Sequence, residues 1–223
     1  MAQYGGLLTT TSGEVWVTAN SSPIALQARK TAALQGKSGF NTKVTHTFPS
    51  GQPVVAFVHC TVEVEITQTV SGNTITIDFL RPNATGTAYV YFFTIFPQIK
   101  PDYGMAVWDA SGTLILTHET RTLSDVVTIG TAGVDASSGY NINTTRAGKW
   151  ACMPVMLGLI TGVVSAGGQP QPYVAIYKSM AKLEGSNTRI YARPQTTPSG
   201  GLQNVAYSNM RNVIMAINCA NYD

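Results

Sequence analysis

The feature that most constrains the fold is the alternation of apolar and polar residues between Cys60 and Leu80. Residues 61–67 read Thr-Val-Glu-Val-Glu-Ile-Thr, which puts the apolar side chains on one face of an extended chain and both glutamates on the other. The turn triplet Ser71-Gly72-Asn73 follows, and apolar residues then alternate from Ile75 to Phe79. The pattern predicts a β-hairpin over residues 60–80 with one buried face and one solvated face.

Other segments favour strands as well. The run from Ala88 to Phe96 is mostly apolar or aromatic, which is typical of a central strand covered on both faces, and it ends at Pro97, which cannot continue a ladder. The apolar run from Ala151 to Ala166 is broken by proline and glycine and predicts two buried strands. It is shorter than the roughly 20 residues that span a bilayer, so we expect no membrane insertion. Further short strands are predicted at Val54–Val58, Val126–Ile129, Tyr173–Tyr177, Arg189–Ala192 and Val213–Ile217.

The sequence does not decide the secondary structure of one segment. Ile24 to Leu34 carries Ile24, Ala28 and Ala32 in helical register after a Ser-Ser-Pro start, but the same residues fit a strand and loop equally well.

A second hairpin signal, Tyr103 to Thr117, is echoed by Tyr4 to Thr18, which shares its Tyr-Gly and Ser-Gly pairs at the same spacing. The proline-bracketed link from Pro97 to Asp102 separates them, as links between domains commonly do. We therefore expect an all-β protein of two tandem antiparallel β-sandwich-like units, residues 1–99 and residues 100–223. Residues 166–172 and 193–201 are interpreted as long exposed loops of the second unit, where recognition tends to occur.

Charge is scarce in this chain. Charged residues make up 11% of the 223 residues, against about 25% in an average protein. Uncharged polar surfaces cost less to desolvate, which favours contacts between subunits or with neutral ligands. The net charge of +3 comes from scattered residues, with no basic run longer than Arg29-Lys30, so nucleic-acid binding is not expected. The start Met1 to Tyr4 has no signal-peptide pattern and predicts folding in a cytoplasm.

The residues that could carry catalysis or bind metal have simpler interpretations. Glu63 and Glu65 lie about 6–7 Å apart on one strand face, a separation a glycosidase could use, but a solvated strand face accounts for them. His59 and Cys60 are consecutive in a strand and point to opposite faces. The three cysteines, among them Cys152 and Cys219, are expected to be buried free thiols. We expect no metal, no cofactor and no enzymatic activity.

Aromatic residues are the remaining candidates for recognition. We interpret Trp16, Trp108 and Trp150 as packing residues of the core and of subunit interfaces, since Trp108 lies within an apolar strand. Tyr140, Tyr173 and Tyr207 lie next to polar loops and are the candidate contacts for a receptor or glycan, because an aromatic face with a polar edge suits a sugar ring.

The segment Tyr103 to Leu116, followed by the arginine-containing stretch Thr117 to Gly130, resembles small virion proteins of tailed bacteriophages, in particular components of the tail tip or tail fibre. The N-terminal copy departs from the pattern at Thr9-Thr10-Thr11, where an apolar segment and an aspartate would be expected. The resemblance carries no catalytic residues.

The resemblance implies a structural protein of the virion tail, made in the cytoplasm of the host bacterium. It would form a homo-oligomer, contact other tail proteins and present its second-half loops to the host surface. Two alternatives remain open: a non-catalytic carbohydrate-binding or receptor-binding module, and a hydrolase of envelope polysaccharide.

Overall fold

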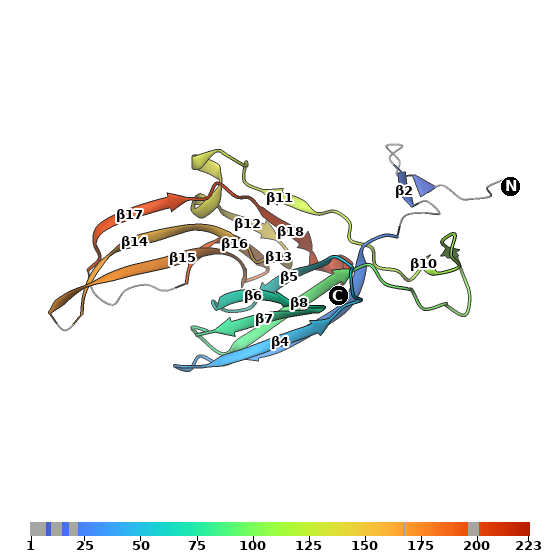
Figure 1. Cartoon of the computed structure of the whole chain (residues 1–223), viewed down its shortest axis with the longest axis horizontal. Helices are drawn as coiled ribbons and strands as arrows, with labels where there is room; N and C mark the ends of the chain where they lie inside the picture. The colour runs from blue at the N-terminus through green and yellow to red at the C-terminus, as the bar shows by residue number, and fades with distance from the viewer. Residues whose placement is uncertain (1–7, 10–14, 18–21, 167, 196–200) are drawn as a thin grey trace.

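The computed structural model describes residues 8–9, 15–17, 22–166, 168–195 and 201–223, and these residues are almost entirely strands and loops (Figure 1). The described residues contain no α-helix, and their helical turns are the 3-10 segments η1 Asp135–Ser137, η2 Gly139–Asn141 and η3 Cys219–Asn221. The all-β prediction is confirmed.

The largest sheet has eleven strands and curls along its length (Figure 1). Its main path runs β11-β18-β13-β5-β15-β14-β17; β8 and then β3 extend it from β5, and β16 and then β12 from β15. The pairing of β15 with β5 is parallel, at Lys182 and Cys60, which makes the sheet mixed. The strands are β3 Ala25–Leu34, β5 Val54–Cys60, β8 Gly86–Thr94, β11 Val127–Ile129, β12 Asn143–Ala147, β13 Trp150–Cys152, β14 Met156–Ala166, β15 Gln169–Glu184, β16 Asn187–Pro194, β17 Gln203–Asn209 and β18 Ile214–Asn218.

Three smaller sheets complete the described structure. A three-stranded sheet has the order β4-β7-β6, with β4 Asn41–Thr47, β6 Glu65–Ser71 and β7 Thr74–Leu80. Two antiparallel pairs join β1 Leu8–Thr9 to β2 Val15–Val17, and β9 Ala106–Trp108 to β10 Leu114–Thr117. Figure 1 shows both pairs at one end of the molecule, while β14, β15 and β17 extend toward the other. Both hairpin predictions agree with these pairs, although most of Tyr4 to Thr18 lies outside the described residues.

The hairpin predicted over residues 60–80 is the pair β6 and β7, closed by Gly72 and Asn73, with Ser71 opposite Thr74. Gly72 has a φ of 58°, a conformation that glycine adopts without steric cost. Ile75, Ile77 and Phe79 are fully buried, as their spacing predicts. These side chains form the face of the three-stranded sheet that packs on the main sheet.

Strand β8 is buried on both faces. Val90 and Phe92 belong to the cluster between the two sheets, and Tyr91 and Phe93 belong to a second cluster on the opposite face. The Phe93 ring also meets the Tyr222 ring edge to face at 4.9 Å. The prediction of a central strand covered on each side is confirmed.

The two halves of the chain share the main sheet and its cores. Strand β5 of the first half pairs with β13 and β15 of the second, and the cluster around Tyr91 contains Ala151, Ile217 and Tyr222. A third cluster, around Leu157, Ile190 and Ile214, lies within the second half. The expectation of two separate tandem sandwiches is therefore too simple as a description of the sheet. The boundary at residues 99 and 100 falls between β8 and β9 and stays a prediction.

A carboxylate also joins distant segments. Asp223 accepts a hydrogen bond from the Tyr91 hydroxyl at 2.6 Å and forms ion pairs with Arg29 at 3.0 Å and Lys149 at 2.9 Å. Arg121 donates to the backbone carbonyls of Tyr222 and Asp223. These contacts hold the last described residues against β3 and β8.

The segment left open between helix and strand is a strand, since Ala25–Leu34 forms β3. Two predictions need correction. Glu63 and Glu65 do not form a solvated face: residues 61–64 lie outside β6, and Glu65 is buried beside Arg81. Residues 166–172 are largely strand, because β14 and β15 pair as far as Ala166 and Gln169. In the segment 193–201, Arg193 and Pro194 end β16, and residues 196–200 lie outside the described structure.

We expect His59 to make stability depend on pH. Its ring is buried and its Nδ1 donates to the Trp150 carbonyl at 2.8 Å; burial lowers the histidine pKa to about 4 from an ordinary 6.5. The unfolded chain therefore takes up a proton near pH 6.5, whereas the folded chain does so only near pH 4. The stabilisation is present above pH 6.5 and is lost as the pH falls toward 4, by roughly 3 kcal/mol in all.

Urea denaturation at pH 7 and at pH 4.5, for the wild type and His59→Gln, measures this effect. The variant should lose less stability between the two pH values than the wild type. Equal losses in the two proteins would contradict the assignment.

Candidate functional site

Four tyrosines from three separated segments lie close together beside β14, and we call them the tyrosine cluster. Tyr140 lies in η2, Tyr173 and Tyr177 in β15, and Tyr207 in β17. The ring of Tyr140 has its centroid 5.8 Å from that of Tyr177 and 5.9 Å from that of Tyr207, with interplanar angles of 46° and 50°. Tyr173 is near enough to Tyr177 to influence its ionisation. The structure thus brings together the three tyrosines predicted from the sequence and adds a fourth.

The cluster lies over a strand that carries glycine on the same face. Gly158 of β14 is opposite Tyr177, and Gly162 is opposite Tyr173. A Cβ on Gly158 would lie 2.7 Å from Cδ1 of Tyr140 and 2.6 Å from the Ser208 carbonyl oxygen. The absence of a side chain at this glycine lets the Tyr140 ring lie close to the sheet.

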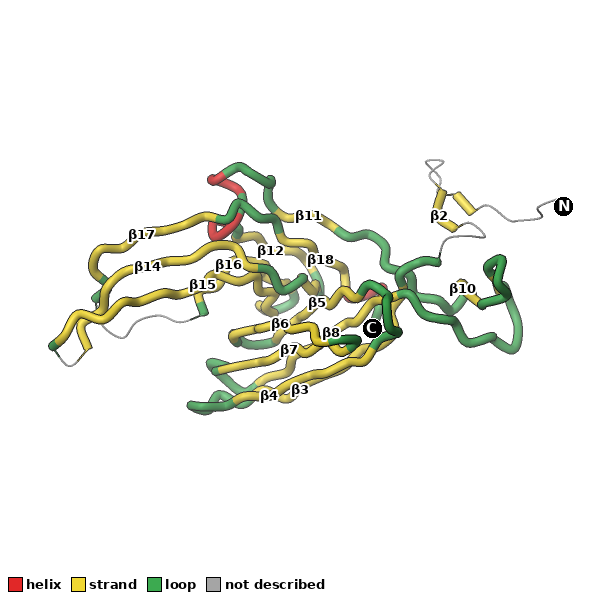
Figure 2. The backbone as a smooth tube through the Cα atoms, in the orientation of Figure 1, coloured by secondary structure: helices red, strands yellow, loops and turns green. Residues whose placement is uncertain are grey.

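The loop that carries Tyr140 is anchored to the end of β17. Arg211 pairs with Asp135 through two hydrogen bonds, of 2.8 Å and 2.7 Å. Asn209 donates to the carbonyl of Ser138 at 3.3 Å, and Gly139 donates its N–H to the carbonyl of Asn212 at 2.8 Å. Figure 2 shows the two short helical turns beside this end of β17. These bonds place Tyr140 between Tyr177 and Tyr207.

The cluster offers aromatic faces and phenolic hydroxyls without formal charge. Tyr207 is the most exposed member, at 56%, while Tyr140, Tyr173 and Tyr177 are half-buried. Burial, and then the neighbouring phenols of Tyr207, Tyr173 and Tyr140, raise the pKa of Tyr177, so its hydroxyl stays protonated at neutral pH. Such a surface can stack on an apolar ring face and hydrogen-bond to hydroxyl groups.

The sequence carried a signal for Tyr177 that our interpretation passed over. Tyr173 and Tyr177 are four residues apart in one strand, so their side chains share a face. The packing of Tyr140 against them had no such signal, because it depends on a loop 30 to 40 residues away in sequence.

The two glutamates weighed as a glycosidase pair are held in separate ion pairs. Glu63 accepts a hydrogen bond from the Tyr191 hydroxyl at 2.7 Å and lies 3.8 Å from the nitrogens of both Lys182 and Arg193. The Tyr191 hydroxyl, followed by these cations, holds the pKa of Glu63 below its usual range. Glu65 pairs with Arg81. A general acid needs a raised pKa, and Glu63 has the opposite shift.

The cysteines and histidines do not form a metal site in the described part of the chain, where no cluster of three or more His, Cys, Asp or Glu residues could hold an ion. Cys60, Cys152 and Cys219 are free and buried, as predicted. Burial raises the pKa of the Cys152 thiol to about 12 and that of Cys219 to about 11, so both stay protonated and unreactive at neutral pH.

Trp108 does not pack in the core of the chain, and its packing at a subunit interface stays a prediction. Its side chain is 48% exposed in β9, because the β9–β10 hairpin buries only a small cluster around Ile115 and Leu116. Trp150 is half-buried and donates its Nε1 hydrogen to the Ala147 carbonyl at 2.9 Å. The side chain of Trp16 lies outside the described structure.

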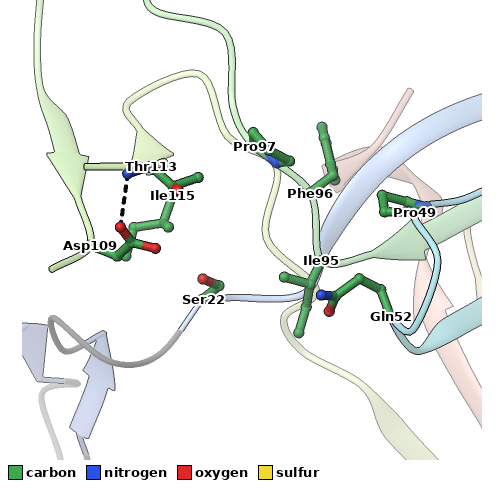
Figure 3. Close-up of a pocket in the computed structure, with 9 residues that line it drawn as sticks. All are labelled: Ser22, Pro49, Gln52, Ile95, Phe96, Pro97, Asp109, Thr113 and Ile115. Carbon is green, nitrogen blue, oxygen red and sulfur yellow. Dashed lines mark hydrogen bonds between the residues drawn. The ribbon is translucent and has the colours of Figure 1, made fainter. Parts of the chain in front are cut away.

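A cavity of about 240 Å³ lies where the β9–β10 hairpin meets the body (Figure 3). Its lining is mainly apolar and includes Ile95, Phe96, Pro97 and Ile115. The carboxylate at its edge, Asp109, already accepts three hydrogen bonds on Oδ1 from the backbone and side chain of Ser111 and the backbone of Thr113. We interpret this cavity as the seam between hairpin and body.

Within the described residues no helix is both long and apolar enough to cross a membrane. Comparisons with protein-family models, with curated proteins and with solved structures each gave no match.

Gly158→Ala tests the packing of the tyrosine cluster. The new methyl group would meet the Tyr140 ring and a backbone carbonyl, so we expect a loss of about 1–3 kcal/mol in the free energy of unfolding and a change in tyrosine fluorescence. Gly201→Ala is the matched control: nothing lies within 4 Å of its Cβ position, and its φ is not in the left-handed region. A Gly158 variant as stable as the control would contradict this packing.

Proposed function

We propose that the protein is a structural component of a bacteriophage tail, at the tail tip or in a fibre, and that it assembles as a homo-oligomer. It is made in the cytoplasm of the host bacterium and works in the virion beside other tail proteins. The resemblance of residues 103–130 to small tail proteins supports this assignment, and so does the formation of the expected hairpin by β9 and β10.

The observation that carries the proposal is the apolar surface of this hairpin region. Ile99 is 88% exposed and Tyr103 80%, and Met105 and Trp108 are each nearly half exposed. Beneath them lies a small apolar cluster of Ile115 and Leu116, with Val107 partly covered. Large apolar side chains gathered on a projecting element mark a protein interaction surface, and a two-stranded unit is marginal alone. Neighbouring subunits in a tail would supply the missing cover.

The proposal retains two sandwich-like units as the underlying architecture. In the first half, β4, β6 and β7 pack over β3, β5 and β8 with one apolar cluster between the layers. In the second half, the curled part of the main sheet surrounds the cluster around Leu157, Ile190 and Ile214.

A second candidate function is recognition of a neutral glycan or receptor through the tyrosine cluster. The specific observation is the convergence of Tyr140, Tyr173, Tyr177 and Tyr207 on one face of the extended strands. This function is compatible with the first, since a tail protein that contacts the host surface needs such a face.

The assembly proposal predicts that the native protein is larger than one chain. Mass spectrometry under non-denaturing conditions should give an integer multiple of the chain mass, and antibody labelling of virions should place the protein on the tail. A monomer at all concentrations, together with its absence from purified virions, would contradict the proposal.

The glycan proposal predicts that Tyr207→Ala weakens binding to host envelope polysaccharide by about tenfold, because one aromatic stacking contact is lost. Tyr103→Ala is the matched control, since Tyr103 is also an exposed tyrosine but lies on the hairpin. Titration calorimetry with purified polysaccharide measures both variants. Equal affinities of the two variants for the polysaccharide would show that the tyrosine cluster takes no part in its recognition.

A further inference from the structure

Strand β17 is an edge strand with little cover. It ends the path of the main sheet and pairs only with β14 among the described strands. Six of its seven residues are exposed, on both faces of the sheet. The edge that faces away from β14 therefore presents backbone N–H and C=O groups that no described strand pairs. Such an edge is a template for another strand.

Several other edge strands carry charges that block such pairing, and the uncharged edges of β11 and of the two short strand pairs are only two to four residues long. Strand β3 contains Arg29 and Lys30, β4 contains Lys43, and β12 contains Arg146. The edge of β6 is occupied in part by Lys178, whose Nζ donates to the Ile66 carbonyl at 3.2 Å. Charged side chains on an edge oppose pairing with a second chain.

Strand β17 has no such protection over its regular part. Its sequence is Gln-Asn-Val-Ala-Tyr-Ser-Asn, with no charge and no proline. A bulge disturbs its beginning, where the register with β14 shifts and Asn204 has a φ of 50°. Residues 206–209 keep a regular register with β14 and form an uncharged edge, which Val205 precedes.

We propose that β17 pairs antiparallel with β17 of a second copy of this chain, around a two-fold axis at Ala206. This inference deepens the proposed homo-oligomer by naming its interface. The pairing places Ala206 opposite its own copy and Val205 opposite Tyr207 of the partner subunit, an aromatic and β-branched pair of the kind that stabilises sheets. Because the strand is uncharged, the two-fold axis brings no like charges together.

The same pairing covers exposed apolar surface. Val205 and Tyr207 are 41% and 56% exposed and lie on the face of the tyrosine cluster, because Tyr207 is opposite Ile160, which shares that face with Gly158 and Gly162. The two tyrosine clusters would then lie side by side across the axis. A register centred on Tyr207 would instead oppose Val205 to Asn209, whose side chain is already bonded to Ser138 and Arg211.

Ala206→Cys tests the axis directly. Mild oxidation with diamide should link the two copies through this position in high yield, because residues at a two-fold axis face themselves. The native cysteines are buried and do not compete. Thr45→Cys, an exposed position on the edge strand β4, is the matched control and should give little linked product.

A charge exchange gives a second readout. Ala206→Lys and Ala206→Glu should each weaken self-association at least tenfold in sedimentation experiments, and an equimolar mixture should restore it as a heterodimer. If the wild type is oligomeric but Ala206→Cys does not crosslink and the two charged variants self-associate as the wild type does, the β17 interface alone is overturned and the tail assembly still stands. A wild type that stays monomeric in solution overturns the interface, whereas absence from virions counts against the tail function.

Discussion

The two apolar clusters that join the layers of the first half to the second half depend on strand β8 being covered on both faces. Val90 and Phe92 point to the layer formed by the three-stranded sheet, while Tyr91 and Phe93 point to residues of the second half. A strand buried in this way needs no polar face, and its buried hydroxyl groups are paired: Tyr91 donates to Asp223, and Thr94 donates to the Pro53 carbonyl. Burial of an unpaired hydroxyl would cost about 1–3 kcal/mol, which explains why the Asp223 carboxylate accompanies it.

Many of the few charged side chains of the chain form ion pairs with other segments of the same chain. Glu63 joins Lys182 and Arg193 of the second half, and Asp135 holds Arg211. Exposed pairs of this kind contribute about 0–1 kcal/mol each, so their value lies in fixing how segments meet more than in stability. The β17 strand and much of the β9–β10 hairpin surface are left uncharged, and both become places where another molecule can dock at low desolvation cost.

Local patterns predicted the parts of the fold that are decided locally. The β6–β7 hairpin and β8 followed from alternation and from a continuous apolar run, since each depends on neighbouring residues. Burial of Glu65 did not follow, because its partner Arg81 comes from beyond the turn, sixteen residues away.

The β14–β15 hairpin was not predicted, because Pro170 and Pro172 suggested a loop. These prolines are tolerated because β15 pairs with β16 only from Tyr177 onward, which leaves an unpaired edge for their ring nitrogens. Tyr173 and Tyr207 were identified as site candidates, but their meeting with Tyr140 depends on tertiary packing alone.

The curled main sheet explains why the two candidate surfaces of the second half coincide. Tyr177 packs against the cluster around Leu157, and β14, β15 and β17 carry the same face beyond that cluster, where no further described layer covers it. Tyrosine suits this position because its ring extends the apolar core while its hydroxyl remains compatible with water. An open sheet of this kind exposes its aromatic face and its last strand at the same place. A partner strand added at β17 would therefore also border the tyrosines, so the proposed self-association and the proposed glycan recognition would use neighbouring surfaces.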